Sequence, residues 1–498
     1  MQPSYWVAST PDTSYAPLEP GVDVDVAVIG GGITGITTAL LLQEEGLSVA
    51  LVEMKRLARG VSGYTTAKVT SGHGLIYDTL RSKHGPDAAR VYAESNEAAL
   101  RWMAETVAAR GIDCDWEPAE NIVYSEDAGD VESLRAEAEA AREVGLPASF
   151  TTDVPLPFTV AGAVRLENQA QFHPRKYLLA LAEHFVAAGG RVFEETRALD
   201  VREGDPCTVS TARGDLRARH VVVATHLPFL DRGLFFAKAH PSMSYAIAAP
   251  VDAAAAPPGM HISTSQPTRS IRTTPYGDRR LLILGGEGHK PGARRDTRES
   301  YEALELTLRE RFGLDEVAFR WCTHDYSPVD GLPYIGALRR TTDRIFVATG
   351  FAKWGLTKGT LAAMVLRDAI VGRDNPWAET YAANRLNVRQ SAVAFVKENA
   401  AVGARFVGDR LRPAQAEAAA LAPGQGAVVR DGRRRLAVRR DEAGDLHVLS
   451  ARCTHLGCIV RWNEAESSWD CPCHGSRFAA DGTVVEGPAV DDLPRETL

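Results

Sequence analysis

The feature that most constrains this chain is a short C-terminal stretch that is crowded with cysteine and histidine. Three of the seven cysteines are scattered along the sequence. The other four share the stretch with two histidines: Cys453, His455, Cys458, Cys471, Cys473 and His474. Such a local cluster favours a metal site over the dispersed cysteine framework of a secreted, disulfide-rich protein.

Two short motifs make up this stretch. Cys453-Thr-His455 is followed by fifteen residues and then by Cys471-Pro-Cys473-His474. This arrangement resembles the two-loop ligand set of Rieske proteins, in which two thiolates bind one iron and two neutral imidazoles bind the other. Over residues 421–498 the resemblance implies a 2Fe-2S cluster with these ligands: Cys453, His455, Cys471 and His474. In the cytochrome bc type of Rieske protein, the two remaining cysteine positions form a disulfide that clamps the ligand loops, which implies a Cys458–Cys473 bond.

A zinc module is the alternative, since Cys and His at short spacings also bind zinc. Structural zinc sites favour CxxC knuckles, whereas the first motif here is CxH, so we prefer the Rieske interpretation. A spectrum of the reduced protein distinguishes the two. In high-potential Rieske relatives, a serine and a tyrosine after the last ligand donate hydrogen bonds to sulfur. Here Ser476 is present but Phe478 stands at the tyrosine position, so we expect a lower potential.

A second motif lies near the N-terminus. Residues 25–29 form a short apolar run that predicts a strand, residues 33–45 predict a helix, and residues 48–53 predict a second strand. Between strand and helix, Gly30, Gly32 and Gly35 make GxGxxG, where backbone N–H groups and the positive helix end can meet a pyrophosphate. Glu53 ends the second strand, where a carboxylate can accept ribose hydroxyls. A glycine turn without a ligand is the alternative.

Later segments resemble the D-amino-acid oxidase, glycine oxidase and sarcosine oxidase superfamily. They run from Trp321 to Gly336 and from Phe346 to Thr357, and the resemblance covers residues 4–373. It implies bound FAD and oxidation of amines or amino acids next to nitrogen. The cofactor-binding positions that it implies, beyond the glycine motif and Glu53, are Thr65, Thr66, Asp330, Gly350, Gly355, Leu356 and Thr357.

No catalytic base stands out in the sequence, and the catalytic residues are unknown at this stage. Arg272 is a candidate because a guanidinium can pair with a substrate carboxylate, although an ordinary structural pair is the alternative. Lys353 is a second candidate near the flavin ring, with a surface or packing role as its alternative. Cys322 lies where sarcosine oxidases attach flavin through a thioether, and a buried, unreactive cysteine is the preferred interpretation.

These signals predict an α/β FAD-binding, Rossmann-like domain with an interleaved α+β substrate domain, plus a C-terminal all-β Rieske domain. We expect the oxidoreductase part at residues 1–375, a helical connector at 376–420 and the Rieske domain at 421–498. Within the first part, the FAD-binding segments are expected at 22–85, 150–230 and 325–375.

Composition narrows the choice of partners. A net charge of −8 offers no general attraction to nucleic acid or to an anionic membrane. No apolar stretch reaches the length that spans a bilayer, and the N-terminus lacks the pattern of a secretion signal, so we expect a cytoplasmic protein. The expected partners are a small amine or amino-acid substrate and an external electron acceptor or donor.

The two cofactors suggest an electron relay, because amine oxidation releases two electrons whereas a Rieske cluster takes one at a time, and a flavin can do both. The expected function is an amine or amino-acid dehydrogenase. A cluster-fed flavin reductase or oxygenase component, and a redox sensor without turnover, are the alternatives. A Rieske oxygenase needs a second iron held by two histidines and a carboxylate, and the sequence shows no histidine pair beside a carboxylate.

Overall fold

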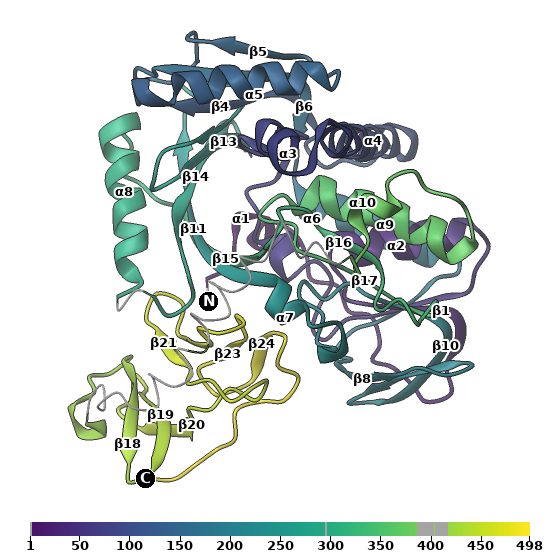
Figure 1. Ribbon diagram of the computed structural model, residues 1–498. Coiled ribbons are helices and arrows are strands. Elements are labelled where there is room, and N and C mark those ends of the chain that lie inside the picture. Colours follow the sequence, from purple (N-terminus) through teal and green to yellow (C-terminus); the bar gives the residue numbers. More distant parts are fainter. Residues whose placement is uncertain (1, 294–295, 386–402, 404–416) are drawn as a thin grey trace.

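The computed structural model describes residues 2–293, 296–385, 403 and 417–498. Two sheets with their helices form the larger part of the molecule, and a small β domain at the C-terminus packs against it (Figure 1). The chain passes between the two large sheets several times before it enters the small domain.

The first sheet is built on buried parallel strands. Its order is β16-β17-β10-β1-β2-β7, with β9 paired to β10 and β8 paired to β9. The four central strands are parallel to one another, and their apolar runs are buried as expected for a sheet covered on both faces. The strands are β1 (Asp23–Ile29), β2 (Val49–Val52), β7 (Arg191–Phe193), β8 (Ala198–Arg202), β9 (Cys207–Thr211), β10 (Gly214–Val223), β16 (Tyr334–Ala337) and β17 (Ile345–Thr349).

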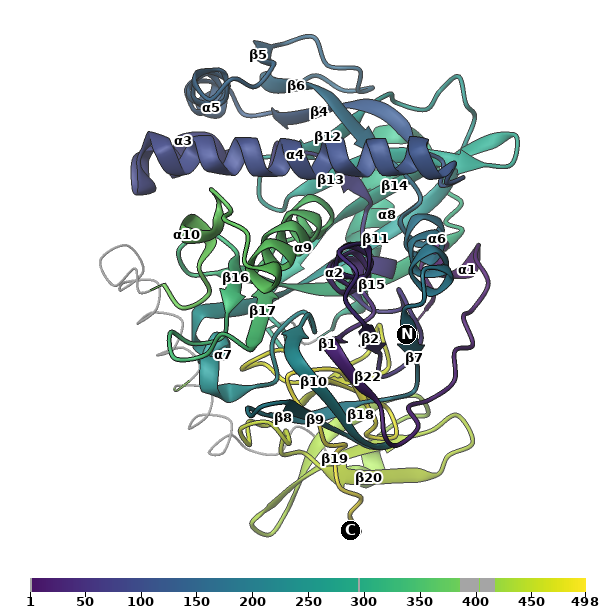
Figure 2. The same cartoon turned by 90° about the vertical axis from the view of Figure 1, so that its right-hand side faces the viewer.

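Helices pack between this sheet and the second one, as Figure 2 shows. The helix that follows β1, α2 (Ile33–Glu44), contacts both α6 (Pro174–Ala187) and α9 (Gly355–Val371). Ten of the twelve α2 residues are buried, so this helix is a central element of the core. Of two short helices, α1 (Tyr5–Ala8) contacts α6 and α10 (Ala378–Tyr381) contacts β16.

The second sheet is mostly antiparallel, in the order β15-β11-β14-β13-β12-β4-β6-β3, with β5 paired to β6. One face of its long strands is turned toward the first sheet. The strands are β3 (Lys68–Val69), β4 (Glu117–Ser125), β5 (Ala148–Thr151), β6 (Gly162–Gln171), β11 (Ala239–Val251), β12 (Met260–Ser263), β13 (Arg269–Tyr276), β14 (Arg279–His289) and β15 (Phe319–Pro328).

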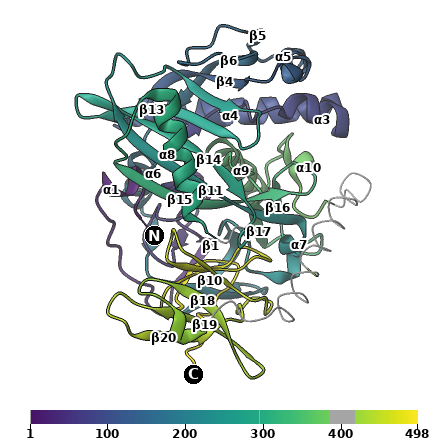
Figure 3. The same ribbon diagram turned by 90° about the vertical axis from the view of Figure 1, so that its left-hand side faces the viewer.

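Helices also border the second sheet (Figure 3). The helix α8 packs on β11 and β14, and α5 packs on β5 and β6. The remaining helical elements are α3 (Ile76–His84), α4 (Pro86–Arg110), α5 (Val131–Glu143), α7 (Phe235–Lys238), α8 (Arg298–Phe312) and the 3₁₀ turns η1 (Val61–Gly63), η2 (Ala128–Asp130), η3 (Asp231–Gly233) and η4 (Ala418–Ala420).

The C-terminal domain consists of two small antiparallel sheets. The first has the order β18-β19-β20 and the second the order β21-β22-β23-β24. The loops between β20 and β21, and between β22 and β23, hold the cysteine and histidine motifs. The strands are β18 (Gly426–Asp431), β19 (Arg434–Arg440), β20 (Leu446–Ser450), β21 (Arg461–Asn463), β22 (Ser468–Asp470), β23 (Arg477–Ala479) and β24 (Val484–Glu486).

The fold class expected from the sequence is confirmed. The expected strand, helix and strand near the N-terminus are β1, α2 and β2, with ends that agree or differ by at most two residues. Most of the expected connector, residues 386–402 and 404–416, lies outside the described residues. Among the described helices, none combines the length and the apolar character that a membrane crossing requires.

Candidate functional site

The glycine motif closes a tight turn between β1 and α2. Gly30 has φ = +111°, a conformation that side chains disfavour, and a Cβ there would lie 2.5 Å from the Ala224 carbonyl oxygen. A Cβ at Gly35 would lie 1.8 Å from the Gly30 carbonyl oxygen, so the helix can approach the strand only because this residue is glycine. Gly32 is the N-cap of α2, which leaves the positive end of a long helix next to the turn.

Glu53 lies directly beside this turn. Its carboxylate accepts the backbone N–H groups of Gly31 at 2.8 Å and of Lys55 at 2.9 Å. Burial raises the pKa of this carboxyl group, although both N–H bonds favour its charged form. The carboxylate is therefore held at a fixed place in the site, next to the glycine turn.

A cavity of about 530 Å³ begins at this turn and extends between the two large sheets to the C-terminal domain. This volume lies in the usual range for cofactor and ligand pockets. The cavity walls include the following residues expected from the sequence: Gly30, Gly32, Glu53, Thr65, Thr66, Lys353, Gly355 and Leu356. Trp354, which stacks on His73 with ring centroids 4.7 Å apart, also lines it.

Other expected site residues lie outside the cavity wall. Asp330 is buried and paired with Arg385, with a distance of 2.8 Å between Oδ2 and Nε. Thr357 donates its hydroxyl hydrogen to the Thr70 carbonyl at 3.0 Å. Gly35 and Gly350 shape the backbone around the site without lining the cavity.

Arg272 does not fit its expected role. It is 1% exposed and does not line the cavity. Its guanidinium donates to backbone carbonyls, among them those of Phe172 and Thr273, and it lies 5.3 Å from the Trp6 ring. Burial lowers the pKa of Arg272 to about 9. Because its donors are engaged inside the protein, the structural role that the sequence left open is the one the geometry supports.

Lys353 and Cys322 both line the cavity. The Lys353 backbone N–H donates to Oδ2 of Asp325 at 2.7 Å, and burial lowers the pKa of its side chain. Lys353 has φ = +72°, so its backbone is strained at the cavity wall. Cys322 is 2% exposed, and burial raises the pKa of its thiol well above the ordinary value, which makes the thiol a poor nucleophile.

The four expected cluster ligands meet at the tips of two loops. Cys453 and Cys471 are buried free thiols, and Nδ1 of both His455 and His474 is buried without a hydrogen-bond partner. The two imidazole rings have centroids 5.0 Å apart. Two buried sulfurs and two buried nitrogens with free lone pairs are the donor set of a Rieske cluster, so the residues fit this group.

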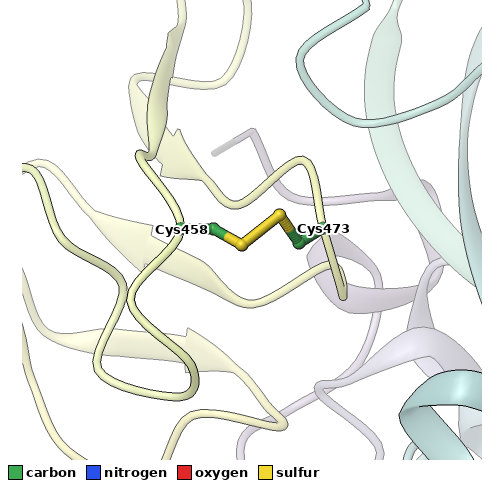
Figure 4. The surroundings of a disulfide bond; sticks show 2 residues. All are labelled: Cys458 and Cys473. Carbon is green, nitrogen blue, oxygen red and sulfur yellow. A yellow bond between two sulfur atoms is a disulfide. The ribbon is translucent and has the colours of Figure 1, made fainter. Parts of the chain in front are cut away.

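The loops are joined as expected. Cys458 and Cys473 form a disulfide with a Cα–Cα distance of 6.5 Å, which links one ligand loop to the other (Figure 4). The pKa of Cys453 is lowered to about 7, first because the Cys471 thiol hydrogen-bonds to it, and also because Ser476 and two backbone N–H groups point at its sulfur. These donors would stabilise negative charge on the cluster.

The C-terminal domain packs against the larger part in all three views (Figures 1, 2 and 3), and several of its residues line the cavity. Oδ1 of Asp231 lies 2.9 Å from Nε2 of His455, and Phe236 packs edge-on against both imidazole rings. Arg197 donates to the Val490 carbonyl at 3.0 Å and to Asp492 at 2.9 Å. The histidine side of the cluster site is therefore covered by the larger part.

Tyr326 connects the cavity wall to the cluster site. Its hydroxyl donates to the carbonyl of His474 at 2.8 Å and lies 3.1 Å from Nε2 of His324, which lines the cavity. The C-terminal domain contributes Arg477 and Glu486 to the same cavity. Sequence analysis missed Tyr326, Arg477 and Glu486, because each lies in a strand whose partners at this site are far away in the chain.

The same region contains two histidines beside a carboxylate. Ligand atoms of His226, His324 and Glu486 all lie within 4.8 Å of one another. Burial lowers the pKa of His226, but the nearby carboxylates of Asp325 and Glu486 outweigh it and raise this pKa to about 9. The sequence showed no such group, and this argued against an oxygenase. The structure corrects that point, because three separate segments of the chain bring the two histidines and the carboxylate together.

Comparisons with known proteins identify a family for each of the two parts of the chain. The family described as FAD dependent oxidoreductase matches residues 25–369, and the Rieske [2Fe-2S] domain matches residues 413–495. YhfW of Bacillus subtilis (strain 168), which is named as a Rieske 2Fe-2S iron-sulfur protein, is 37% identical over 497 residues, 99% of this chain and 97% of that protein.

Two further similarities concern the larger part. Gamma-glutamylputrescine oxidoreductase of Escherichia coli (strain K12) is 28% identical over 230 residues, 44% of this chain and about half (53%) of that protein. Glycine oxidase from Geobacillus kaustophilus superposes with a TM-score of 0.63 at 20% identity, covering 74% of this chain and 100% of that chain, which shows the shared fold. The chain therefore belongs to the FAD-dependent oxidoreductase family and carries a Rieske [2Fe-2S] domain at its C-terminal end.

Proposed function

We propose that this protein is an amine or amino-acid dehydrogenase that passes electrons from FAD to its Rieske 2Fe-2S cluster and on to an external acceptor. The observation that carries the proposal is the shared wall between the two cofactor sites. Glu486 and Arg477 of the Rieske domain line the cavity that begins at the glycine turn, and Tyr326 hydrogen-bonds to the carbonyl of the cluster residue His474.

The dinucleotide part of FAD would lie at the β1–α2 turn. Gly30 and Gly32 would let the pyrophosphate approach the backbone and the N-terminus of α2, and Gly35 would keep α2 close to β1. The buried carboxylate of Glu53 would accept ribose hydroxyls. Thr65, Thr66, Gly355 and Leu356 line the cavity farther along and would surround the flavin end.

The cluster would be held by Cys453 and Cys471 on one iron and by His455 and His474 on the other. When bound, FAD takes two electrons from a carbon next to nitrogen and can release them singly, which matches a one-electron cluster. The protein's part is to keep both sites in contact and to exclude water between them. Phe236 and Tyr326 fill that space from the larger part.

The names of similar proteins support a substrate that carries an amino group. The E. coli relative is named for gamma-glutamylputrescine, and structures with the same fold include a glycine oxidase. Lys353 is the cavity residue best suited to meet a substrate carboxylate, because its side chain lines the cavity close to Gly288 of β14. Lys353→Met should raise the KM for an amino acid more than it lowers kcat. For an amine without a carboxylate, the substitution should change neither KM nor kcat.

The decisive experiment is an anaerobic screen of amines and amino acids on the full protein, with the spectra of both cofactors followed in time. We expect a substrate to bleach the flavin first and the cluster to be reduced afterwards. If a substrate bleaches the flavin while the cluster stays oxidised, the relay is wrong. If no amine bleaches the flavin but a reduced electron donor reduces first the cluster and then the flavin, electrons flow in the reverse direction.

A further inference from the structure

Three side chains from three elements converge between the cavity and the cluster site. His226 follows the end of β10, His324 lies in β15, and Glu486 ends β24 of the Rieske domain. All three line the cavity. We propose that His226, His324 and Glu486 bind a divalent transition-metal ion such as Zn²⁺ or Fe²⁺, at a site separate from the iron–sulfur cluster.

The hydrogen bonds of His324 fix which of its nitrogens is free. The Tyr326 hydroxyl has one hydrogen, and it donates that hydrogen to the carbonyl of His474 at 2.8 Å. Toward Nε2 of His324, at 3.1 Å, the same oxygen acts as the acceptor, so the imidazole hydrogen is on Nε2. In the neutral ring, Nδ1 then presents its lone pair, which is the form that binds a metal.

That lone pair faces a carboxylate in a buried place. The His324 side chain is completely buried, and its Nδ1 lies 2.7 Å from Oε2 of Glu486, a distance that a proton or a metal ion between the two atoms would account for. A lone pair and a carboxylate oxygen repel each other unless a proton or a metal ion lies between them. A proton would join only these two atoms, whereas a metal ion would also engage His226, whose ligand atom lies within 4.8 Å of both.

The distances suit a common ion. Zinc lies about 2.1 Å from nitrogen and oxygen ligands, so two ligand atoms at a right angle or at a tetrahedral angle are about 3.0 to 3.4 Å apart. The observed separations are 2.7 Å from His324 Nδ1 to Glu486 and 3.7 Å from His226 Nδ1 to Oε1 of Glu486. The second distance is too long for a direct hydrogen bond, and small side-chain movements bring both atoms to coordination distance.

The backbone and the ligand types support the same conclusion. His226 has φ = +66°, a strained conformation for a residue with a side chain, and such strain is typical of functional positions. Two imidazoles and one carboxylate suit Zn²⁺ or Fe²⁺, whereas Mg²⁺ and Ca²⁺ prefer oxygen ligands. Three protein ligands leave further coordination positions open, and these face the cavity. Because Glu486 belongs to the Rieske domain, the ion would also join that domain to the larger part.

The test uses the full protein with flavin and cluster in place. After dialysis against a chelator, cobalt(II) is added anaerobically, bound metal is measured by mass spectrometry, and visible d–d bands report its ligands. We expect one cobalt ion per chain in addition to the two cluster irons. Loss of a hydrogen-bond partner of a metal ligand costs about 10- to 100-fold in affinity, so loss of a ligand in His324→Gln or Glu486→Gln should cost about 100-fold or more.

A matched control keeps the result specific. His447→Gln changes another histidine of the Rieske domain, which pairs with Asp441 at the surface, and should bind cobalt like the unaltered protein. Flavin content and cluster absorbance show that each variant is folded. The proposal is overturned if the folded protein takes up no cobalt, or if either ligand variant binds it with unchanged affinity. The amine screen tests the proposed function independently, because flavin bleaching is measured in protein without the added metal.

Discussion

Phe478 is completely buried in the same apolar cluster as the two cysteine ligands, Cys453 and Cys471. We expect Phe478→Tyr to raise the midpoint potential of the Rieske cluster, because a new hydroxyl donor near sulfur stabilises the extra electron of the reduced form. A hydrogen bond that is stronger in the reduced form by about 1.4 kcal/mol corresponds to about 59 mV for one electron. The midpoint is measured by a redox titration followed by EPR.

The matched change lies two residues away. Ser476 already hydrogen-bonds to Cys453, so Ser476→Ala should lower the midpoint potential by a similar amount. A midpoint that is unchanged or lower in Phe478→Tyr would show that the new hydroxyl does not reach a cluster sulfur. The zinc alternative predicts no reducible cluster in any of these variants.

Lys358 is a buried lysine in α9 whose Nζ donates to the Phe351 carbonyl at 3.0 Å. Burial lowers its pKa to about 7, far below the ordinary value of 10.5. Between pH 7 and about 10.5 the unfolded chain binds a proton here that the folded chain does not, so this residue makes stability increase as the pH rises. The increase is at most about 1.4 kcal/mol per pH unit.

Lys358→Met should remove this dependence. We expect the unfolding free energy of the unaltered protein to increase relative to that of the variant between pH 7 and pH 9. Both are measured by urea unfolding at each pH, with flavin fluorescence as the signal. Using the difference between the two proteins removes the contribution of all other titrating groups. Parallel stability curves for the two proteins over this range would show that Lys358 stays charged in the folded protein.

At the scale of elements, the β1–α2–β2 unit could be predicted because all its signals are local. The apolar run, the glycine turn, the helix and Glu53 are neighbours in sequence, and the structure has them in the expected order. The cluster loops could be predicted for the same reason. Arg272 was harder to interpret: its strand could be predicted, but the carbonyls that occupy its guanidinium belong to residues far away, such as Phe172.

The contact between β1 and α2 leads to a prediction about Gly35. An added Cβ would lie 1.8 Å from the Gly30 carbonyl oxygen, so Gly35→Ala must push the helix away from the strand. Overpacking of this kind costs about 1–3 kcal/mol, and we expect FAD affinity to fall about tenfold or more, measured by flavin release on dilution. Gly129→Ala is the control, because Gly129 is exposed, lies outside the cavity wall, and an added Cβ there would come no closer than 3.3 Å to its nearest neighbour, Oδ1 of Asp127. Equal FAD affinity in both variants would contradict the role given to Gly35.

At the scale of the whole molecule, the cavity is a product of domain packing. Its far wall comes from β24 and the loop after it, while its near wall comes from the N-terminal turn. No local pattern marks Glu486 as a neighbour of His226 or His324, since the contact exists only when the Rieske domain docks. The sequence therefore predicts both cofactors, whereas the path between them depends on the tertiary structure.

A substitution at Tyr326 tests the electron path between flavin and cluster, because the Tyr326 hydroxyl joins β15 to the His474 carbonyl. Such a hydrogen bond contributes about 1 kcal/mol, which corresponds to about a fivefold change in rate. In Tyr326→Phe we expect the substrate to bleach the flavin at the usual rate and the cluster to be reduced about fivefold more slowly, in anaerobic stopped-flow experiments. Tyr381→Phe is the control, since this buried hydroxyl contacts Ser95 far from the Rieske domain. Cluster reduction at the same rate in both variants would mean that electrons cross the interface elsewhere, for example beside Phe236, which packs on both histidine ligands.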